Sequence, residues 1–314
     1  MSGKFMQALN FWLDTTPPET KAQKGIDVIP ALEAQDLVRC IPYLAMHLCC
    51  LFALSVGVSP LAIGVAVGAY LVRMFAITGF YHRYFSHRTF KTSRFWQFVF
   101  AFIGACSVQR GPIWWAAHHR FHHRHSDTAK DPHSPHMFSF FWSHTAWFMS
   151  HRHFSTRSGL VKDWTEYPEL RILDRFDILA PTLYALALFG IGEWLAAYHP
   201  SWGTDGWQLL IWGFCISTVV LYHATFSINS LAHRWGTRRF DTKDHSRNNG
   251  FLALITLGEG WHNNHHRYPG SVDQGFYWWE VDITSMILKG MSRLGMVWDL
   301  KPVPEKILKE GRNS

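Results

Sequence analysis

The chain has 314 residues, a formal net charge of +7 at pH 7, and 48% hydrophobic residues. Its length is enough for two soluble domains, but the apolar residues gather into long runs, which excludes an ordinary soluble protein. The mean hydropathy of −0.05 indicates that much of the chain nevertheless lies outside lipid.

Four apolar runs are each close to the roughly 20 residues that span a bilayer. They are residues 37–58, 61–81, 178–198 and 207–228. We therefore predict an all-α integral membrane protein with four transmembrane helices, folded as one domain over residues 1–314. The sixteen tryptophans suit the aromatic belts at membrane interfaces. Arg73 lies inside the second run, so we expect that helix to outrun the membrane and place Arg73 near the interface.

Two shorter apolar stretches, residues 95–108 and 138–149, are too short to cross a bilayer. We expect both to form helices at the membrane interface.

The basic residues give the topology. Residues 82–175 contain thirteen lysines and arginines, residues 234–314 contain twelve, and the loop 199–206 contains none. Because basic loops stay in the cytoplasm, the stretches 82–175 and 233–314 should form a cytoplasmic cap, and both termini should be cytoplasmic. The basic charge follows membrane sidedness, so we expect no nucleic-acid partner.

Histidines form two matched triplets far apart in the chain. The first is His119, His122 and His123, and the second is His262, His265 and His266. Each triplet has the spacing i, i+3, i+4, which is one face of a helix. Neutral imidazole is a good ligand for first-row metals, so we expect each triplet to supply half of a metal cage.

Further ligands are expected where the second and fourth runs end. His82 and His87 are five residues apart, which puts their rings about 140° apart on an ideal helix with roughly 100° per residue. They can serve one cage only if the helix distorts or ends there. Asn229 and His233 are four residues apart and share one face. We expect Asn229 to hold a water molecule on a metal, because an amide is a weak ligand.

The nine histidines exceed what one ion needs, so two ions are expected. Nearby acids should orient the rings by accepting their second N–H, and the candidates are Asp127, Asp131, Asp244 and Glu259. A soluble carboxylate di-iron bundle is excluded, because it needs two Glu-x-x-His motifs and this chain has one, from Glu259 to His262. Spacing alone leaves zinc and manganese open.

The histidine segments resemble those of the membrane fatty acid desaturases. The matching residues are 82–87 (HRYFSH), 119–123 (HRFHH) and 259–266 (EGWHNNHH), and Asn229 with His233 is similar to a further ligand segment of the Δ9 acyl-CoA type. The resemblance runs from about residue 82 to residue 269, with the four membrane runs in the expected order.

This resemblance implies a fold, a cofactor and a reaction. The cofactor would be two iron ions, with O2 as co-substrate, and the product a cis double bond, at Δ9, in a saturated acyl chain. No His-Pro-Gly-Gly segment of a fused cytochrome b5 domain is present. The resemblance therefore implies a separate electron donor, namely a ferredoxin, a rubredoxin or a cytochrome b5 with its reductase. The basic cytoplasmic face would steer an acidic donor.

Departures from the family pattern bear on the substrate. Animal acyl-CoA desaturases have an arginine where this chain has Ala117, and an arginine–lysine pair where it has His151 and Arg152. Of that pair Arg152 keeps the positive charge and is a candidate for substrate binding. The acyl carrier therefore remains open between CoA and membrane phospholipid. Residues 111–115 (GPIWW) and the short chain resemble a bacterial inner-membrane protein. We also expect the acyl tail to end near Tyr70, about 18 Å before His82 along the helix.

Two other classes of protein remain as alternatives. A membrane di-iron hydroxylase of alkyl, sterol or carotenoid substrates would yield an alcohol in place of an alkene. A membrane metal transporter fits less well, because transport sites lie near the bilayer midplane and these histidines lie at helix ends and beyond.

Overall fold

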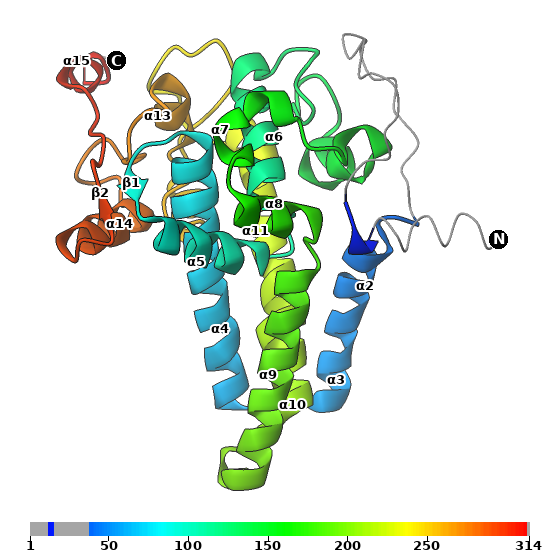
Figure 1. Cartoon of the computed structure of the whole chain (residues 1–314). Coiled ribbons are helices and arrows are strands. Elements are labelled where there is room, and N and C mark those ends of the chain that lie inside the picture. Colours follow the sequence, from blue (N-terminus) through cyan, green and yellow to red (C-terminus); the bar gives the residue numbers. More distant parts are fainter. Residues whose placement is uncertain (1–11, 16–37, 313–314) are drawn as a thin grey trace.

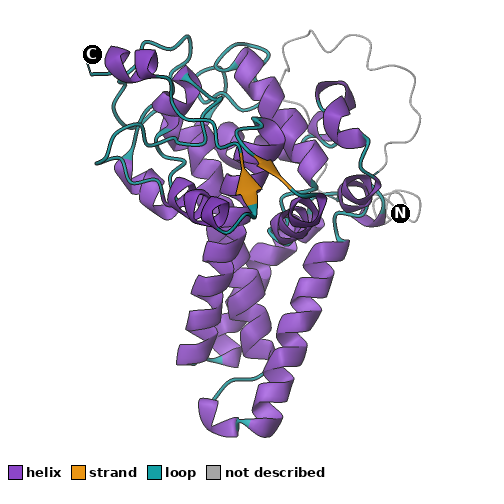
Figure 2. Ribbon diagram, turned by 60° about the vertical axis from the view of Figure 1, so that its left-hand side comes forward, coloured by secondary structure: helices purple, strands orange, loops and turns teal. Residues whose placement is uncertain are grey.

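The computed structural model describes residues 12–15 and 38–312. Long helices run side by side from a wide region of short helices and loops, which we call the cap (Figure 1). Both turns at the far end of the long helices are short, so the cap holds the other ends of all of them (Figures 1 and 2). The described part of the chain is mostly helical, as the apolar runs predict.

Three continuous helical stretches are long and apolar enough to cross a membrane. They are Pro60–Ser86 (α4, Pro60–Phe75, then η2, Ala76–Ser86), Leu179–Tyr198 (α9), and Gly206–His233 (α10, Gly206–Gln208; η8, Leu209–Ile216; α11, Ser217–Ser230; η9, Leu231–His233). The first begins at a defined cap, because Ser59 accepts a hydrogen bond from the Ala62 N–H and Pro60 occupies the first turn.

The first predicted run is shorter than expected. Residue 37 lies outside the described residues, and the helical part is Ile41–Val56, 16 residues in place of 22 (α2, Ile41–Cys49; η1, Cys50–Phe52; α3, Ala53–Val56). Pro42 lies in its first turn and Gly57, with φ of +68°, ends it. Hydropathy measures how apolar the residues are, whereas these two residues decide how many of them are helical.

The two other helices also differ at their ends from the predicted runs. The second continues through residue 86, so His82 lies inside it and not after it. The last continues to His233, which brings Asn229 into the helix.

The cap consists of short elements joined by loops. The stretch predicted to be interfacial at 95–108 is helix α5 (Arg94–Ala105), and the stretch at 138–149 contains η3 (Trp142–Ala146) and η4 (Trp147–Met149). The remaining elements of the cap are α6 (Pro112–His125), η5 (His151–His153), η6 (Ser158–Leu160), α7 (Lys162–Thr165), α8 (Pro168–Arg175), α12 (Gly250–Ile255), α13 (His262–Arg267), α14 (Ile283–Arg293) and α15 (Glu305–Glu310), with strands β1 (Lys91–Thr92) and β2 (Val297–Trp298). The short η7 (Pro200–Trp202) lies instead in the turn between α9 and α10, at the far end of the long helices (Figure 1). The two strands pair antiparallel, Lys91 with Trp298.

Arg73 is buried inside the protein. It is 2% exposed and lies among three helical segments. Its guanidinium donates to the carbonyl oxygens of Ala69 and Cys106, to Thr218 at 2.6 Å and to Ser217. These neutral acceptors make burial of the cation tolerable, since a buried charge without partners is very costly. Arg73 is thus buried within the protein, and its place near the membrane interface stays a prediction; the helix that carries it has 27 residues, which is more than a span needs.

Candidate metal centre

The first pair of histidines is brought together by a local change of helix type. Residues 76–86 form a π-helix, in which hydrogen bonds join residues five apart. Residues with that spacing therefore return to the same side, and the ring centroids of His82 and His87 lie 5.0 Å apart. The 140° separation expected for an ideal α-helix does not occur.

Helix α6 carries the first triplet and is fixed by polar contacts at both ends. At its start the Trp114 N–H donates to Asp174 at 2.7 Å. Further along, Arg120 donates to the carbonyl oxygens of Phe85 and Ser86 and pairs with Asp163. Arg120 thereby joins α6 to the carbonyl end of η2, so the rings of the two elements face one another.

Helix α13 carries the second triplet, and its two asparagines hold it in place. Asn263 accepts hydrogen bonds from the backbone N–H groups of Arg239 and Phe240 at 2.8 and 2.7 Å. Asn264 accepts from Asn248 at 2.7 Å and donates to Glu280 at 2.8 Å. The side-chain amides of Asn263 and Asn264 hydrogen-bond to other parts of the chain, so that of these residues only the histidines face the centre.

The nine predicted histidines meet in two groups. In each group the candidate ligand atoms all lie within 4.8 Å of one another. Cluster one is His82, His87, His119, His123 and His265. Cluster two is His122, His233, His262 and His266.

Each triplet is shared between the clusters, so the expectation that one triplet forms one half of a cage needs correction. In both triplets the residues at i and i+4 join one cluster and the residue at i+3 joins the other. The reason is helical geometry, since i and i+4 lie only about 40° apart and i+3 projects to their other side.

The ring nitrogens are spaced as ligands of one ion would be. Neighbouring Nε2 atoms are 2.8 Å apart for His87 and His119, 3.0 Å for His82 and His265, and 3.1 Å for His233 and His262. Two nitrogens bound at about 2.1 Å and at right angles lie about 3.0 Å apart. Burial and neighbouring histidines lower the pKa of His119 well below its ordinary value, so its ring stays neutral and its lone pair is available for a metal.

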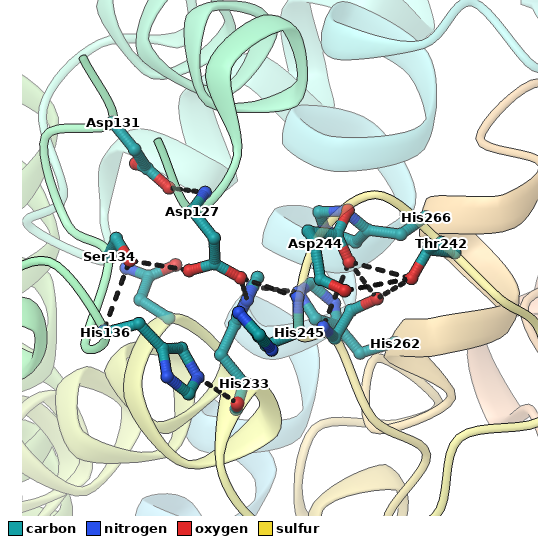
Figure 3. Close-up of polar contacts among 12 residues, drawn as sticks. Asp127, Asp131, Ser134, His136, His233, Thr242, Asp244, His245, His262 and His266 are labelled. Atoms are coloured by element: carbon teal, nitrogen blue, oxygen red, sulfur yellow. Dashed lines mark hydrogen bonds and ion pairs between the residues drawn. The ribbon is translucent and has the colours of Figure 1, made fainter. Parts of the chain in front are cut away.

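All four predicted acids contact a ring nitrogen. Figure 3 shows Asp127 against His233 and Asp244 against His266. Asp127 accepts from Nδ1 of His233 at 2.8 Å, Asp131 from His122 at 3.0 Å, Asp244 from His266 at 2.7 Å, and Glu259 from His82. In each pair Nδ1 is the donor, which leaves Nε2 as the nitrogen that faces the cluster.

These carboxylates are ionised although they are buried. Burial works against the charged form of Asp127, but His233, Ser134 and the His245 N–H together hold its pKa below the ordinary value. For Asp131, burial is likewise outweighed by His122 and His133. The carboxylates therefore place negative charge beside the histidine rings of the centre.

That charge matches two divalent cations. Asp127, Asp131 and Asp244 contribute three negative charges, and Glu259 with Asp282 and Arg83 contributes one more. In cluster two the buried Nε2 of His266 has no hydrogen-bond partner, as a ligand atom reserved for a metal would. The residues present thus fit a dimetal site.

Three residues of this network were not predicted from the sequence. The buried Arg83 donates to Glu259 at 3.1 Å and to Asp282 at 3.0 Å. Gln274 donates to Glu259 at 3.1 Å. Arg83 stands directly beside His82 in a segment already singled out, so its role could have been suspected, but Gln274 and Asp282 belong to no motif.

A cavity of about 240 Å³ reaches the centre. Its lining includes Tyr43 of α2, Tyr222 of α11, and both Asn229 and His119 at the metal centre. A second cavity of about 40 Å³ shares Asn229 and His119 and continues to Met74. Because they share these lining residues, we infer that the two cavities form one path past the clusters, with polar as well as apolar side chains along its inner part.

The two predicted substrate residues lie outside these linings. Tyr70 is one turn before Met74, and its hydroxyl donates to the carbonyl oxygen of Ile255. Arg152 is in η5, next to His153. Met74, and not Tyr70, is the side chain of this helix face that borders the inner end of the path.

Comparison with known proteins agrees with this geometry. Residues 58–292 match the family model "Fatty acid desaturase". The chain is 32% identical over 93% of its length to an acyl-CoA C20 Delta5-desaturase of Anemone leveillei, of which it covers 90%. It is 34% identical over 84% of its length to an sn-1 stearoyl-lipid 9-desaturase of Anabaena variabilis, of which it covers 93%. The chain therefore belongs to the fatty acid desaturase family.

Proposed function

We propose that the protein is an O2-dependent fatty acyl desaturase that introduces a cis double bond, at Δ9, into a saturated acyl chain carried on CoA or on a membrane lipid. The observation that carries this proposal is the convergence of nine histidines into two clusters beside an apolar cavity. The family membership supports it, because the relatives compared above are named as acyl desaturases.

The nine histidines would hold two iron ions, with Asn229 near cluster two as the holder of a water molecule. Iron bound there would supply one-electron and O2 chemistry, which zinc does not have. The four acids fix the ring orientations and balance the charge. The cavity walls exclude water and hold the acyl chain beside His119, so that adjacent carbons are presented to the centre.

We further propose four membrane crossings, with the cap and both termini in the cytoplasm. The helical stretch Ile41–Val56 would be the fourth crossing, since it runs beside the three longer helices (Figures 1 and 2). The basic residues of the cap support this orientation. They also suit an acidic electron donor such as a ferredoxin, a rubredoxin or a cytochrome b5 with its reductase.

The test is expression in a bacterial host that lacks unsaturated lipids, followed by mass spectrometry of each lipid class. We expect a new monounsaturated chain, with the double bond located by fragmentation. A His265→Ala control should remove it. An alcohol product would indicate a hydroxylase, and no change in the lipids would contradict the proposal.

A further inference from the structure

The helical stretch formed by α2, η1 and α3 is the least embedded of the long helices. None of its residues is buried, whereas α4, α9 and α11 each have several. Its outer side is strongly apolar, with Leu48 64% and Leu54 91% exposed. An element with so little buried surface separates from its neighbours at a low free-energy cost.

This weakly held helix forms one wall of the larger cavity. Pro42 and Tyr43 line the cavity from α2, and Tyr222 and Phe226 line it from α11. The ring of Tyr43 lies 5.5 Å from that of Tyr222 and 5.3 Å from that of Phe148. The line along which α2 meets α11, which we call the seam, therefore separates the cavity from the side of the bundle.

Three histidines outside the metal clusters cross this seam. His47 is on α2, His223 on α11 and His144 on η3. Nε2 of His47 lies 3.2 Å from Nε2 of His223, and Nδ1 of His223 lies 3.0 Å from Nε2 of His144. Nδ1 of His144 lies 2.9 Å from the Ser230 hydroxyl.

The chain of hydrogen bonds has one consistent direction. Nδ1 of His47 faces the Tyr43 carbonyl oxygen at 2.9 Å, so it carries the proton and Nε2 accepts. His223 must then donate from Nε2 and accept at Nδ1, and His144 must donate from Nε2. Three neutral rings satisfy this pattern when the Ser230 hydroxyl donates to Nδ1 of His144 in place of the Phe226 carbonyl oxygen, which lies 3.1 Å from it. Loss of His47 or His223 removes the hydrogen bond between α2 and α11.

Histidines on the sides of membrane helices are costly and are kept for a function. Here they hold together the two helices that close the cavity. We propose that the seam is the lateral entrance through which the acyl chain of a bilayer lipid reaches the cavity, and that His47, His223 and His144 form the clasp that holds it shut. The inference rests on the proposed function, because it takes the occupant of the cavity to be an acyl chain.

A native pair of thiols allows the seam to be locked. Cys215 of η8 is in hydrogen-bonding contact with Cys49 at the end of α2, two residues after His47 of the clasp. Both thiols are free. Oxidation to a disulfide would fix α2 against η8, and a Cys50→Ser background leaves Cys49 as the only partner on that helix.

The test uses the full-length protein in nanodiscs with a phosphatidylcholine that carries a diazirine in the middle of one acyl chain. After illumination, adducts are mapped by mass spectrometry. We expect cavity adducts at Tyr222 or Trp115 in the reduced protein, their loss after oxidation, and their return with reductant. Oxidant on a Cys215→Ser variant should have no effect.

A second measurement tests the clasp. His47→Ala should label the cavity several-fold faster than the wild type, while His199→Ala, on the loop beyond α9, should not. Equal cavity labelling in the oxidised and reduced forms would overturn the entrance. Cavity labelling by a diazirine acyl-CoA but not by the lipid would overturn the lipid route, and an unchanged rate in His47→Ala would overturn the clasp. Labelling needs no turnover, so absence of desaturation would count only against the proposed function.

Discussion

The two metal clusters are built from the same residue type but are supported differently. In cluster two, three of four histidines donate Nδ1 to an aspartate. In cluster one, within residues 12–15 and 38–312, only His82 has a carboxylate partner, Glu259. Three residues of cluster one are only half-buried, whereas in cluster two three residues are fully buried and the side chain of the fourth, His266, is 2% exposed. An anionic partner fixes a ring and makes it a stronger ligand, so we infer that cluster two is the more rigid and tighter metal site.

The largest expected effect comes from removing that support. Asp244→Asn keeps the shape of the side chain but removes the charge that faces Nδ1 of His266. We expect metal affinity at cluster two to fall by about 10- to 100-fold, so that iron per chain drops after dialysis against a chelator. Glu259→Gln should instead weaken cluster one.

Asp299→Asn is the matched control, because Asp299 pairs only with the exposed Lys91 among the residues described. The comparison between the clusters would fail if Asp244→Asn retained all its iron under conditions that strip the Glu259→Gln variant.

The sequence predicts the histidines of the centre but not which acid contacts which ring. The two triplets and the pairs near residues 82 and 229 identified all nine histidines, because helical spacing alone predicts which side chains share a face. Which acid serves which ring depends on how α6, α11 and α13 approach one another. That approach is set by Arg120, Asn263 and Asn264, which no spacing rule identifies.

The fold shows the same limit. Apolar runs located the long helices to within a few residues, since burial in lipid needs only length and hydrophobicity. They missed the π-helical turn at 76–86 and overestimated the first helix. They also gave no sign that Arg73 is buried among neutral acceptors, because these acceptors come from residues 106, 217 and 218.

A smaller effect concerns His153, which is buried behind the cavity wall against Trp147 and His118. Burial, together with Arg157 and Arg152, lowers the pKa of His153 to about 3, against an ordinary 6.5. Below pH 6.5, His153 binds a proton in the unfolded chain but stays neutral in the folded chain. Stability is therefore complete above pH 6.5 and falls as the pH drops toward 3, by about 1.4 kcal/mol per pH unit.

His153→Gln should therefore reduce the loss of unfolding free energy between pH 7 and pH 5 by about 2 kcal/mol. Denaturant unfolding of the metal-free protein in detergent measures this. His199→Gln, an exposed site, should leave the pH dependence unchanged. An unaltered slope in His153→Gln would show that this ring is charged in the folded chain.

The smallest expected effect is on chain length. Met74 borders the inner end of the path beside cluster one, and Tyr70 lies one turn beyond it. Met74→Ala should shift the product toward longer acyl chains, and Tyr70→Ala should do so less, because its side chain is not part of the lining. Lipid mass spectrometry of expressing cells reports both. A larger shift in Tyr70→Ala would place the end of the path at Tyr70.

The iron content of purified protein tests the two-cluster account most directly. We expect two iron ions per chain in the wild type by elemental analysis, and about one in each of His265→Ala and His262→Ala, which remove a ligand from cluster one and cluster two respectively. Loss of one iron ion should leave either variant without desaturation. A single ion in the wild type, or full turnover by either variant, would contradict it.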